Sequence, residues 1–307
     1  MKIEYSNPFT AQGRWLKGNL HTHTTASDGV RTPQETVDHY SQHGYDFLSI
    51  TDHGSITDPI HLNSHGMTLI PGEEICVGDS LAGTNTHMVA VNIKETLPLA
   101  DFNKATDPQE AIDLTARQGG FMIIAHPYWS GLHMSDLLRL RGYLGVEIYN
   151  TSCDVYRGTG YSAQHIDALI AAGRRLLIFA TDDHHGAPEP MKPSDACGAW
   201  IMVKSTGNTT QSITKAIEGG LFYASNGPTI HSVEVKPEGI QVKTSPVKHI
   251  TFVSTPSLGA RFTALGAPLT EYTYPGRPGE TYVRIEATDY EGRVAWTNPI
   301  YNSHPRA

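Results

Sequence analysis

The pattern of apolar and polar positions divides the chain into two parts. In the first part, short apolar runs rich in Ile, Val, Leu and Phe alternate with stretches whose apolar residues recur at helical spacing. Runs without a polar face are typical of strands that are buried on both sides. We predict such strands at Trp15–Leu20, Asp46–Thr51, Met67–Ile70, Met88–Ile93, Phe121–Ala125, Val146–Tyr149 and Leu176–Ala180.

Helix-start and helix-stop signals lie between these runs. Thr32-Pro33-Gln34-Glu35 has a capping-box pattern with proline at the first helical position, and Asp107-Pro108-Gln109-Glu110 has a similar one. Further helices are predicted over Ser162–Ala172 and Thr209–Glu218, and both are followed by glycine. This alternation of strands and helices predicts an α/β barrel or a layered α/β fold.

From about Pro228 the pattern changes. Short runs of alternating polarity are divided by Pro and Gly turns, and no helical spacing appears. These runs are His231–Lys236, Ile240–Lys243, Ile250–Ser254, Thr281–Thr288 and Val294–Trp296. We therefore predict an α/β domain over residues 1–227 and a small all-β domain over residues 228–307.

Composition and charge narrow the classes of function. The chain has 307 residues, 39% of them hydrophobic, and a net charge of −8. An acidic balance without a basic stripe argues against long nucleic acids as partners, although it leaves nucleotides and short oligonucleotide ends open. The apolar runs are too short for a signal peptide or a membrane span. We expect a cytoplasmic protein without a membrane partner, and the oligomeric state stays open.

Histidine is the most informative residue type, with 16 copies against 3 cysteines. The cysteines are far apart and odd in number, which indicates neither a disulfide framework nor a thiolate metal knuckle. Many histidines instead stand with carboxylates at the ends of the predicted strands. They form the groups His21, His23 and Asp28; Asp52 and His53; Glu73 and Glu74; His87; His126; and Asp182, Asp183, His184 and His185.

These groups point to metal chemistry. Catalytic residues of barrels gather at the carboxyl ends of strands, so clusters that are distant in sequence should converge. His21 and His23 are two positions apart and face the same way on a strand. Imidazole and carboxylate ligands without thiolate suit zinc, manganese or iron, and a carboxylate such as Glu73 can bridge two ions.

Each motif alone also has a structural explanation, as a hydrogen-bonded histidine, a solvated carboxylate or a polar turn. Their repetition at the strand ends favours the metal site. The other histidines lack carboxylate neighbours and are interpreted as surface or structural residues, except His133, which is ambiguous. The surface or structural set is His39, His43, His61, His65, His165, His231, His249 and His304.

At these motifs the sequence resembles the PHP (polymerase and histidinol phosphatase) family of metal-dependent phosphoesterases, over about Trp15 to Asn226. The matching motifs are Leu20-His21-Thr22-His23 with Ser27-Asp28-Gly29, Ile50-Thr51-Asp52-His53, Pro71-Gly72-Glu73, His87, Ala125-His126-Pro127 and Asp182-Asp183-His184. The resemblance implies a distorted (β/α)7 barrel. The tail around Trp296–Ile300 is similar to a branch with a C-terminal β domain that includes carbaryl-hydrolysing enzymes.

The resemblance also implies a ligand set for two or three divalent ions. One ion would be held by His21, His23, Glu73 and Asp182, and a second by Glu73, His87 and His126. A third would be held by Asp28, His53 and His184. The acidic residue at position 28 leaves the occupancy of this third site open, since some relatives have histidine nearby.

The leading hypothesis is a hydrolase that cleaves a small phosphoester, such as a nucleotide or a sugar phosphate, with a metal-bridging hydroxide. Arg157, with Asn150, is the candidate for binding phosphate. His185 is a candidate proton donor or metal-shell residue, and Asp52 a candidate for orienting His53 or a neighbouring imidazole. Two alternatives stay open: hydrolysis of a carbamate or carboxylic ester, and a non-catalytic scaffold.

Overall fold

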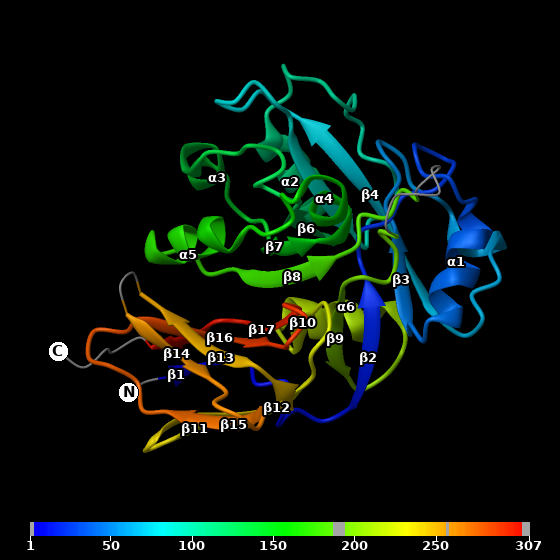
Figure 1. Cartoon of the computed structure of the whole chain (residues 1–307). Helices are drawn as coiled ribbons and strands as arrows, with labels where there is room; N and C mark the ends of the chain where they lie inside the picture. Colours follow the sequence, from blue (N-terminus) through cyan, green and yellow to red (C-terminus); the bar gives the residue numbers. More distant parts are fainter. Residues whose placement is uncertain (1–2, 187–193, 256–257, 303–307) are drawn as a thin grey trace.

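The chain has a mixed α/β fold, seen in a computed structural model that describes residues 3–186, 194–255 and 258–302 (Figure 1). Its helices are α1 (Pro33–Gln42), α2 (Pro108–Arg117), α3 (Met134–Arg139), α4 (Thr151–Arg157), α5 (Ala163–Ala171) and α6 (Thr210–Glu218), with a 3-10 turn at Pro59–His61. Among the residues described, no helix has the length and apolar character needed to cross a membrane.

The strands of the first part form a continuous run in the order β9-β2-β3-β4-β5-β6-β7-β8. Their bounds are β2 (Arg14–Asn19), β3 (Phe47–Ile50), β4 (Thr68–Val77), β5 (Thr86–Val91), β6 (Phe121–Ile124), β7 (Gly145–Asn150), β8 (Leu177–Thr181) and β9 (Trp200–Ser205). The predicted strands are therefore found, but β4 is much longer than the predicted Met67–Ile70, and β9 was not predicted.

Strand β5 runs against its neighbours. The pairs β2/β3, β3/β4, β6/β7 and β7/β8 are parallel, whereas β5 is antiparallel to both β4 and β6. The start of β5 therefore lies at the edge where the parallel strands end. This reversal explains why a histidine at a strand start, His87, joins the groups at the strand ends.

The segments that follow β2 and β8 meet at the same edge. The His23 amide donates to the His184 carbonyl at 2.8 Å, and the Asp183 amide donates to the His21 carbonyl at 2.9 Å. These bonds join the segment after β2 to the segment after β8. The polar residues that follow β2, β3 and β8, and those at the ends of β4 and β5, are thereby brought to one place.

The described residues of the C-terminal part form strands and no helix, and they gather below β8 in Figure 1. Its strands are β11 (Ile230–Lys236), β12 (Gly239–Val247), β13 (His249–Ser254), β14 (Gly259–Thr263), β15 (Leu269–Tyr274), β16 (Tyr282–Thr288), β17 (Val294–Thr297) and β18 (Ile300–Asn302). Strand β18 also pairs with β1 (Ile3–Glu4).

One sheet crosses the predicted domain boundary. Strand β17 pairs with β10 (Phe222–Ser225), which in turn pairs with β9. The Asn298 side chain accepts from the Ile178 amide and donates to the carbonyls of Gly220 and Phe222. The division at residue 227 stays a prediction about domains, because the two parts share backbone pairing there.

Local signals predicted the helices well. Thr32 caps α1 with a capping box to Glu35, and Asp107 caps α2. Helices α5 and α6 lie within the predicted ranges. Helices α3 and α4 were not predicted, because helices of six and seven residues are too short to show an apolar period.

Candidate metal centre

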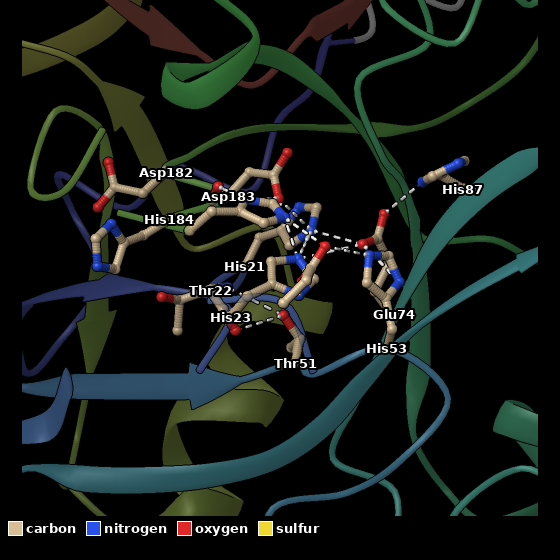
Figure 2. A network of polar contacts seen from close by, with 12 residues as sticks. His21, Thr22, His23, Thr51, His53, Glu74, His87, Asp182, Asp183 and His184 are labelled. Atoms are coloured by element: carbon tan, nitrogen blue, oxygen red, sulfur yellow. Dashed lines mark hydrogen bonds and ion pairs between the residues drawn. The ribbon is translucent and has the colours of Figure 1, made fainter. Parts of the chain in front are cut away.

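A buried cluster of histidines and carboxylates lies at the edge where β2, β3, β4 and β8 end (Figure 2). Four ligand atoms face one another within 4.8 Å, from His21, His23, Glu74 and Asp183. The Nε2 atoms of His21 and His23 are 3.3 Å apart, and Asp183 Oδ1 lies 3.1 Å from both. Glu74 Oε2 lies 3.4 and 3.2 Å from the same two nitrogens.

This first group fits a divalent metal ion. The buried Asp183 Oδ1 has no hydrogen-bond partner among the described residues, in spite of its close neighbours. His21 Nδ1 contacts Glu147 Oε1 at 2.8 Å, which leaves the lone pair of His21 on Nε2, directed at the centre of the group. Converging lone pairs from imidazole and carboxylate are the donor set of zinc, manganese or iron.

Glu74 extends the cluster on its other side. Its Oε1 lies 3.0 Å from His87 Nδ1 and 3.3 Å from His126 Nε2. The other ring nitrogen of His126 contacts Ser130 Oγ at 3.1 Å, so Nε2 is the nitrogen that faces Glu74. One carboxylate thus faces two sets of imidazoles, which is the geometry of a bridging ligand.

A third group lies toward the solvent. His185 Nε2 lies 3.3 Å and His53 Nε2 3.6 Å from Asp28 Oδ2. The His185 ring stacks on His23 with centroids 4.2 Å apart. Asp28 is half-exposed, so this group is the most open of the three.

Glu73 does not lie in the cluster, and the prediction that it does is wrong. Strand β4 continues through position 77, and side chains alternate between its two faces. Glu74 therefore faces the histidines, while Glu73 points the other way and accepts a hydrogen bond from the Leu97 amide at 2.8 Å. The predicted strand ended at Ile70 and gave no register for these two carboxylates.

The prediction that Asp182 lies in the cluster is also wrong, by one position. Its carboxylate accepts hydrogen bonds from the Tyr40 and Thr151 hydroxyls and from backbone amides. The amides belong to Cys197, Gly198 and Ala199. Asp183, with a left-handed φ of 54°, turns the chain so that its own side chain enters the cluster. In Figure 2, Asp182 and His184 lie apart from the contacts that join the other residues.

His184 is held outside the cluster as well. Its Nδ1 contacts Asp195 Oδ1 at 2.7 Å, and Arg31 donates to its Nε2 at 2.5 Å. Both ring nitrogens are therefore engaged, and it is His185 that reaches Asp28. The structure brings His21, His23, Asp28, His53, His87 and His126 together. Where the prediction named Glu73, Asp182 and His184, the residue that follows each of them faces the cluster instead.

The other candidates have different surroundings from those expected. Among the described residues, Asp52 contacts no imidazole directly. It accepts from the Thr24 amide at 2.7 Å and from Ser27 Oγ at 2.8 Å, and Ser27 contacts His23 Nδ1. Asn150 is buried, and its amide donates to Glu147 and Asp183. It therefore supports the cluster from behind rather than facing a substrate.

A cleft of about 380 Å³ opens above the cluster. Phe102 and Trp129 form its walls, and Arg157 contributes a cation at its edge. Phe102 packs on His53 with centroids 5.1 Å apart, and Trp129 packs on His126 at 5.0 Å. The Arg157 guanidinium lies 5.8 Å from the Trp129 ring. The predicted phosphate-binding arginine therefore does line the cleft.

Three residues that the sequence analysis overlooked support the cluster. Glu147 contacts His21 and accepts from the His126 amide at 2.9 Å. Asp101 Oδ2 lies 3.5 Å from His53, and Cys76 Sγ 3.1 Å from His87. The signal for Glu147 was present, since a carboxylate inside an apolar strand needs a buried partner. Asp101 and Cys76 carried no such signal.

The pKa values in the cluster reflect its mixed charges. Burial lowers the pKa of His23, but Asp183 and Glu74 outweigh that effect and raise it to about 9. Burial raises the pKa of Glu74, but His21, His87 and His126 outweigh it and hold that pKa well below its usual range. Burial raises the pKa of Asp28, but the neighbouring His185 outweighs this effect, and the pKa of Asp28 is lowered to about 2. Protons and divalent cations compete for the same lone pairs.

Comparison with known proteins gives the fold. No family model matches the chain. A solved two-domain protein from Bacteroides vulgatus, which contains a predicted PHP-like metal-dependent phosphoesterase, matches with a TM-score of 0.52. The chain shares the fold of this PHP-like protein. The match covers 91% of this chain and 92% of the other at 19% identity, so the resemblance holds for both parts of the fold.

Sequence relatives match about a third of the chain. An uncharacterized protein of Methanocaldococcus jannaschii is 26% identical over 124 residues, which are 37% of this chain and 68% of that protein. A 5′-3′ exoribonuclease of Haemophilus influenzae is 33% identical over 106 residues, which are 32% of this chain and 38% of the enzyme. The chain thus spans little more than a third of the exoribonuclease.

The exclusion of long nucleic acids is wrong. A relative with 33% identity is an exoribonuclease, which acts on RNA. The net charge of −8 was a poor guide, because divalent ions in an acidic site supply a positive field that the sequence sum does not contain.

Proposed function

We propose that this protein is a metal-dependent phosphoesterase whose centre is built around Glu74. The observation that carries the proposal is the position of this one carboxylate among five imidazoles, each with a nitrogen 3.0–3.4 Å from a Glu74 oxygen: His21, His23, His53, His87 and His126. Such an arrangement has little use in a scaffold, because burying so many polar groups opposes folding unless they bind something.

The ligand set follows from the three groups. His21, His23, Glu74 and Asp183 would hold one ion, and Glu74, His87 and His126 a second. Asp28, His53 and His185 would hold a third. When bound, divalent ions of the zinc, manganese or iron class generate a nucleophile from water and neutralise charge on phosphoryl oxygens. Ligation of His185 would exclude it as the proton donor.

Arg157 would orient the phosphoryl group. It is the cation among the described residues that line the cleft, and a guanidinium binds two phosphate oxygens at once. Phe102 and Trp129, which are 55% and 36% exposed, offer apolar walls to the rest of the substrate. A phosphoester that carries a flat ring, such as a nucleotide or the end of a nucleic acid, matches these walls.

The proposal extends to the type of α/β fold. The run from β2 to β8 returns on itself through the bonds of His23 to His184 and Asp183 to His21. We infer a distorted (β/α)7 barrel in which β5 is reversed. The buried side chains of β2 to β8 in the main core support this inference.

A paired assay tests the function. Protein prepared with Mn²⁺, Zn²⁺ or Fe²⁺ is given nitrophenyl phosphate and nitrophenyl acetate, before and after chelation. We expect hydrolysis of the phosphate, its loss on chelation and its return with added metal. Preferential hydrolysis of the acetate would replace the proposal with the ester and carbamate alternative. Less than one ion per chain under metal-replete conditions would favour the scaffold.

A further inference from the structure

We propose that His39, His43 and Cys197 form a separate metal site of the zinc class, on the side of α1. One ligand atom from each residue lies within 4.8 Å of the others. The three residues belong to none of the groups around Glu74. The sequence analysis treated both histidines as surface or structural residues and considered the cysteines too far apart for a thiolate metal knuckle.

The two histidines are arranged as a pair of ligands. They are four positions apart at the end of α1, so they lie on the same face of the helix, and their ring centroids are 4.3 Å apart. His43 Nδ1 donates a hydrogen bond to the His39 carbonyl at 2.7 Å. This bond fixes the tautomer and leaves the lone pair of His43 on Nε2, as is typical of metal-bound imidazoles.

The cysteine is placed by a strained piece of backbone. Cys197 has a left-handed φ of 58°, which residues other than glycine rarely adopt. The Cys197 amide donates to Asp182 Oδ2 at 2.8 Å, and the next two amides donate to Oδ1 of the same carboxylate. Asp182 thus holds the thiol in position beside α1, and a strained conformation that is held so firmly is a sign of function.

The donor set determines the kind of ion. Two imidazoles and a thiolate suit zinc, whereas magnesium and manganese prefer oxygen ligands. Lys17 lies beside the site, with its amine 3.5 Å from the His43 carbonyl. The positive charge of Lys17 opposes the binding of a metal cation. The negative charge of the Cys197 thiolate is therefore needed to offset it.

A metal at this site would fix the Cys197 segment to α1. The same segment contains Asp195, which accepts from His184 and from the His185 amide at 2.9 Å. A metal at this site would therefore stabilise, from outside the cleft, the hydrogen bond by which Asp195 holds His185. This inference does not depend on the phosphoesterase proposal, because it concerns metal binding alone.

Cobalt spectroscopy on the full chain provides the test. Co²⁺ bound to a thiolate gives a charge-transfer band in the near ultraviolet, and Co²⁺ bound only by imidazole and carboxylate does not. Cys76→Ser is the background for the test, because Cys76 lies against His87 at the other centre and a thiolate there would give a band of its own. We expect the band in Cys76→Ser protein loaded with excess Co²⁺, and its loss when Cys197→Ser is added.

Two further variants keep the test decisive if Cys197→Ser does not fold. His43 is exposed, and His43→Gln should weaken the binding that produces the band at least about tenfold. His65→Gln, at an exposed histidine that pairs with Asp38, should leave it unchanged. The proposal is overturned by a band that persists when Cys197→Ser is added to Cys76→Ser, by the absence of the band from Cys76→Ser, or by equal affinities in the two histidine variants.

Discussion

Two pairs of adjacent carboxylates, Glu73-Glu74 on β4 and Asp182-Asp183 after β8, each send one side chain into the centre and one away from it. On β4 the separation follows from strand alternation, and the outward Glu73 accepts a single hydrogen bond within the described part of the chain, from the Leu97 amide. After β8 the separation follows from a left-handed residue, and the outward Asp182 is bound by two hydroxyls and three backbone amides.

This difference shows that the outward carboxylate of a pair can have little structural role, or can act as an anchor that holds several segments together. Glu73 is buried, and its Oε2 has no hydrogen-bond partner among the described residues. Burial raises its pKa to about 7. Asp182 instead joins α1, α4 and the segment before β9. Four substitutions test this contrast, and they are ordered below from the largest expected effect to the smallest.

Glu74→Gln should have the largest effect. The amide keeps the size of the side chain but loses the charge that faces five imidazoles, so phosphoester kcat/KM should fall at least about 10³-fold. Elemental analysis should show fewer bound ions, and circular dichroism should show a folded protein. Full activity in this variant would remove Glu74 from the centre.

Asp183→Asn should reduce kcat/KM by roughly 10²-fold or more. It removes an anionic ligand from the group of His21 and His23 but leaves Glu74 in place. Metal titration should show weaker binding at the first site. If metal affinity and rate were both unchanged, the ligand assignment of this residue would be wrong.

Asp182→Asn should act on stability. An amide cannot accept all the hydrogen bonds that the carboxylate accepts, and buried donors are left unpaired, at a cost of about 2–4 kcal/mol in unfolding free energy. Denaturant unfolding monitored by circular dichroism measures this effect. A variant as stable as the wild type would contradict the role of Asp182 as an anchor.

Glu73→Gln should have the smallest effect, with kcat/KM within about twofold of the wild type. The glutamine carbonyl can still accept from the Leu97 amide, and the side chain faces away from the histidines. Steady-state kinetics beside Glu74→Gln make the comparison direct. A loss of activity like that of Glu74→Gln would reverse the assignment of the two carboxylates.

Much of the fold could be predicted from local pattern. The caps at Thr32 and Asp107 act within a few residues, so the sequence shows them directly. The histidines of the centre were found because each follows or opens an apolar strand. The resemblance to a PHP-like fold is confirmed by the match to the solved two-domain protein.

The register of the carboxylates could not be predicted, because it depends on how far a strand continues. The alternation on β4 beyond Ile70 is fixed by pairing with β5, which is distant in sequence and reversed. The left-handed turn at Asp183 is fixed by its bond to His21 across the structure. The partner of His184, Asp195, lies in a polar segment without any periodic signal.

The pairing of β10 with β17 has a practical consequence for dissecting the chain. A fragment ending at residue 227 would expose β10 as an open sheet edge and would lose the Asn298 side chain that bonds to Ile178, Gly220 and Phe222. Open edges recruit other chains and aggregate. The shortest piece suitable for expression therefore includes the last strands, even for work that concerns only the metal centre.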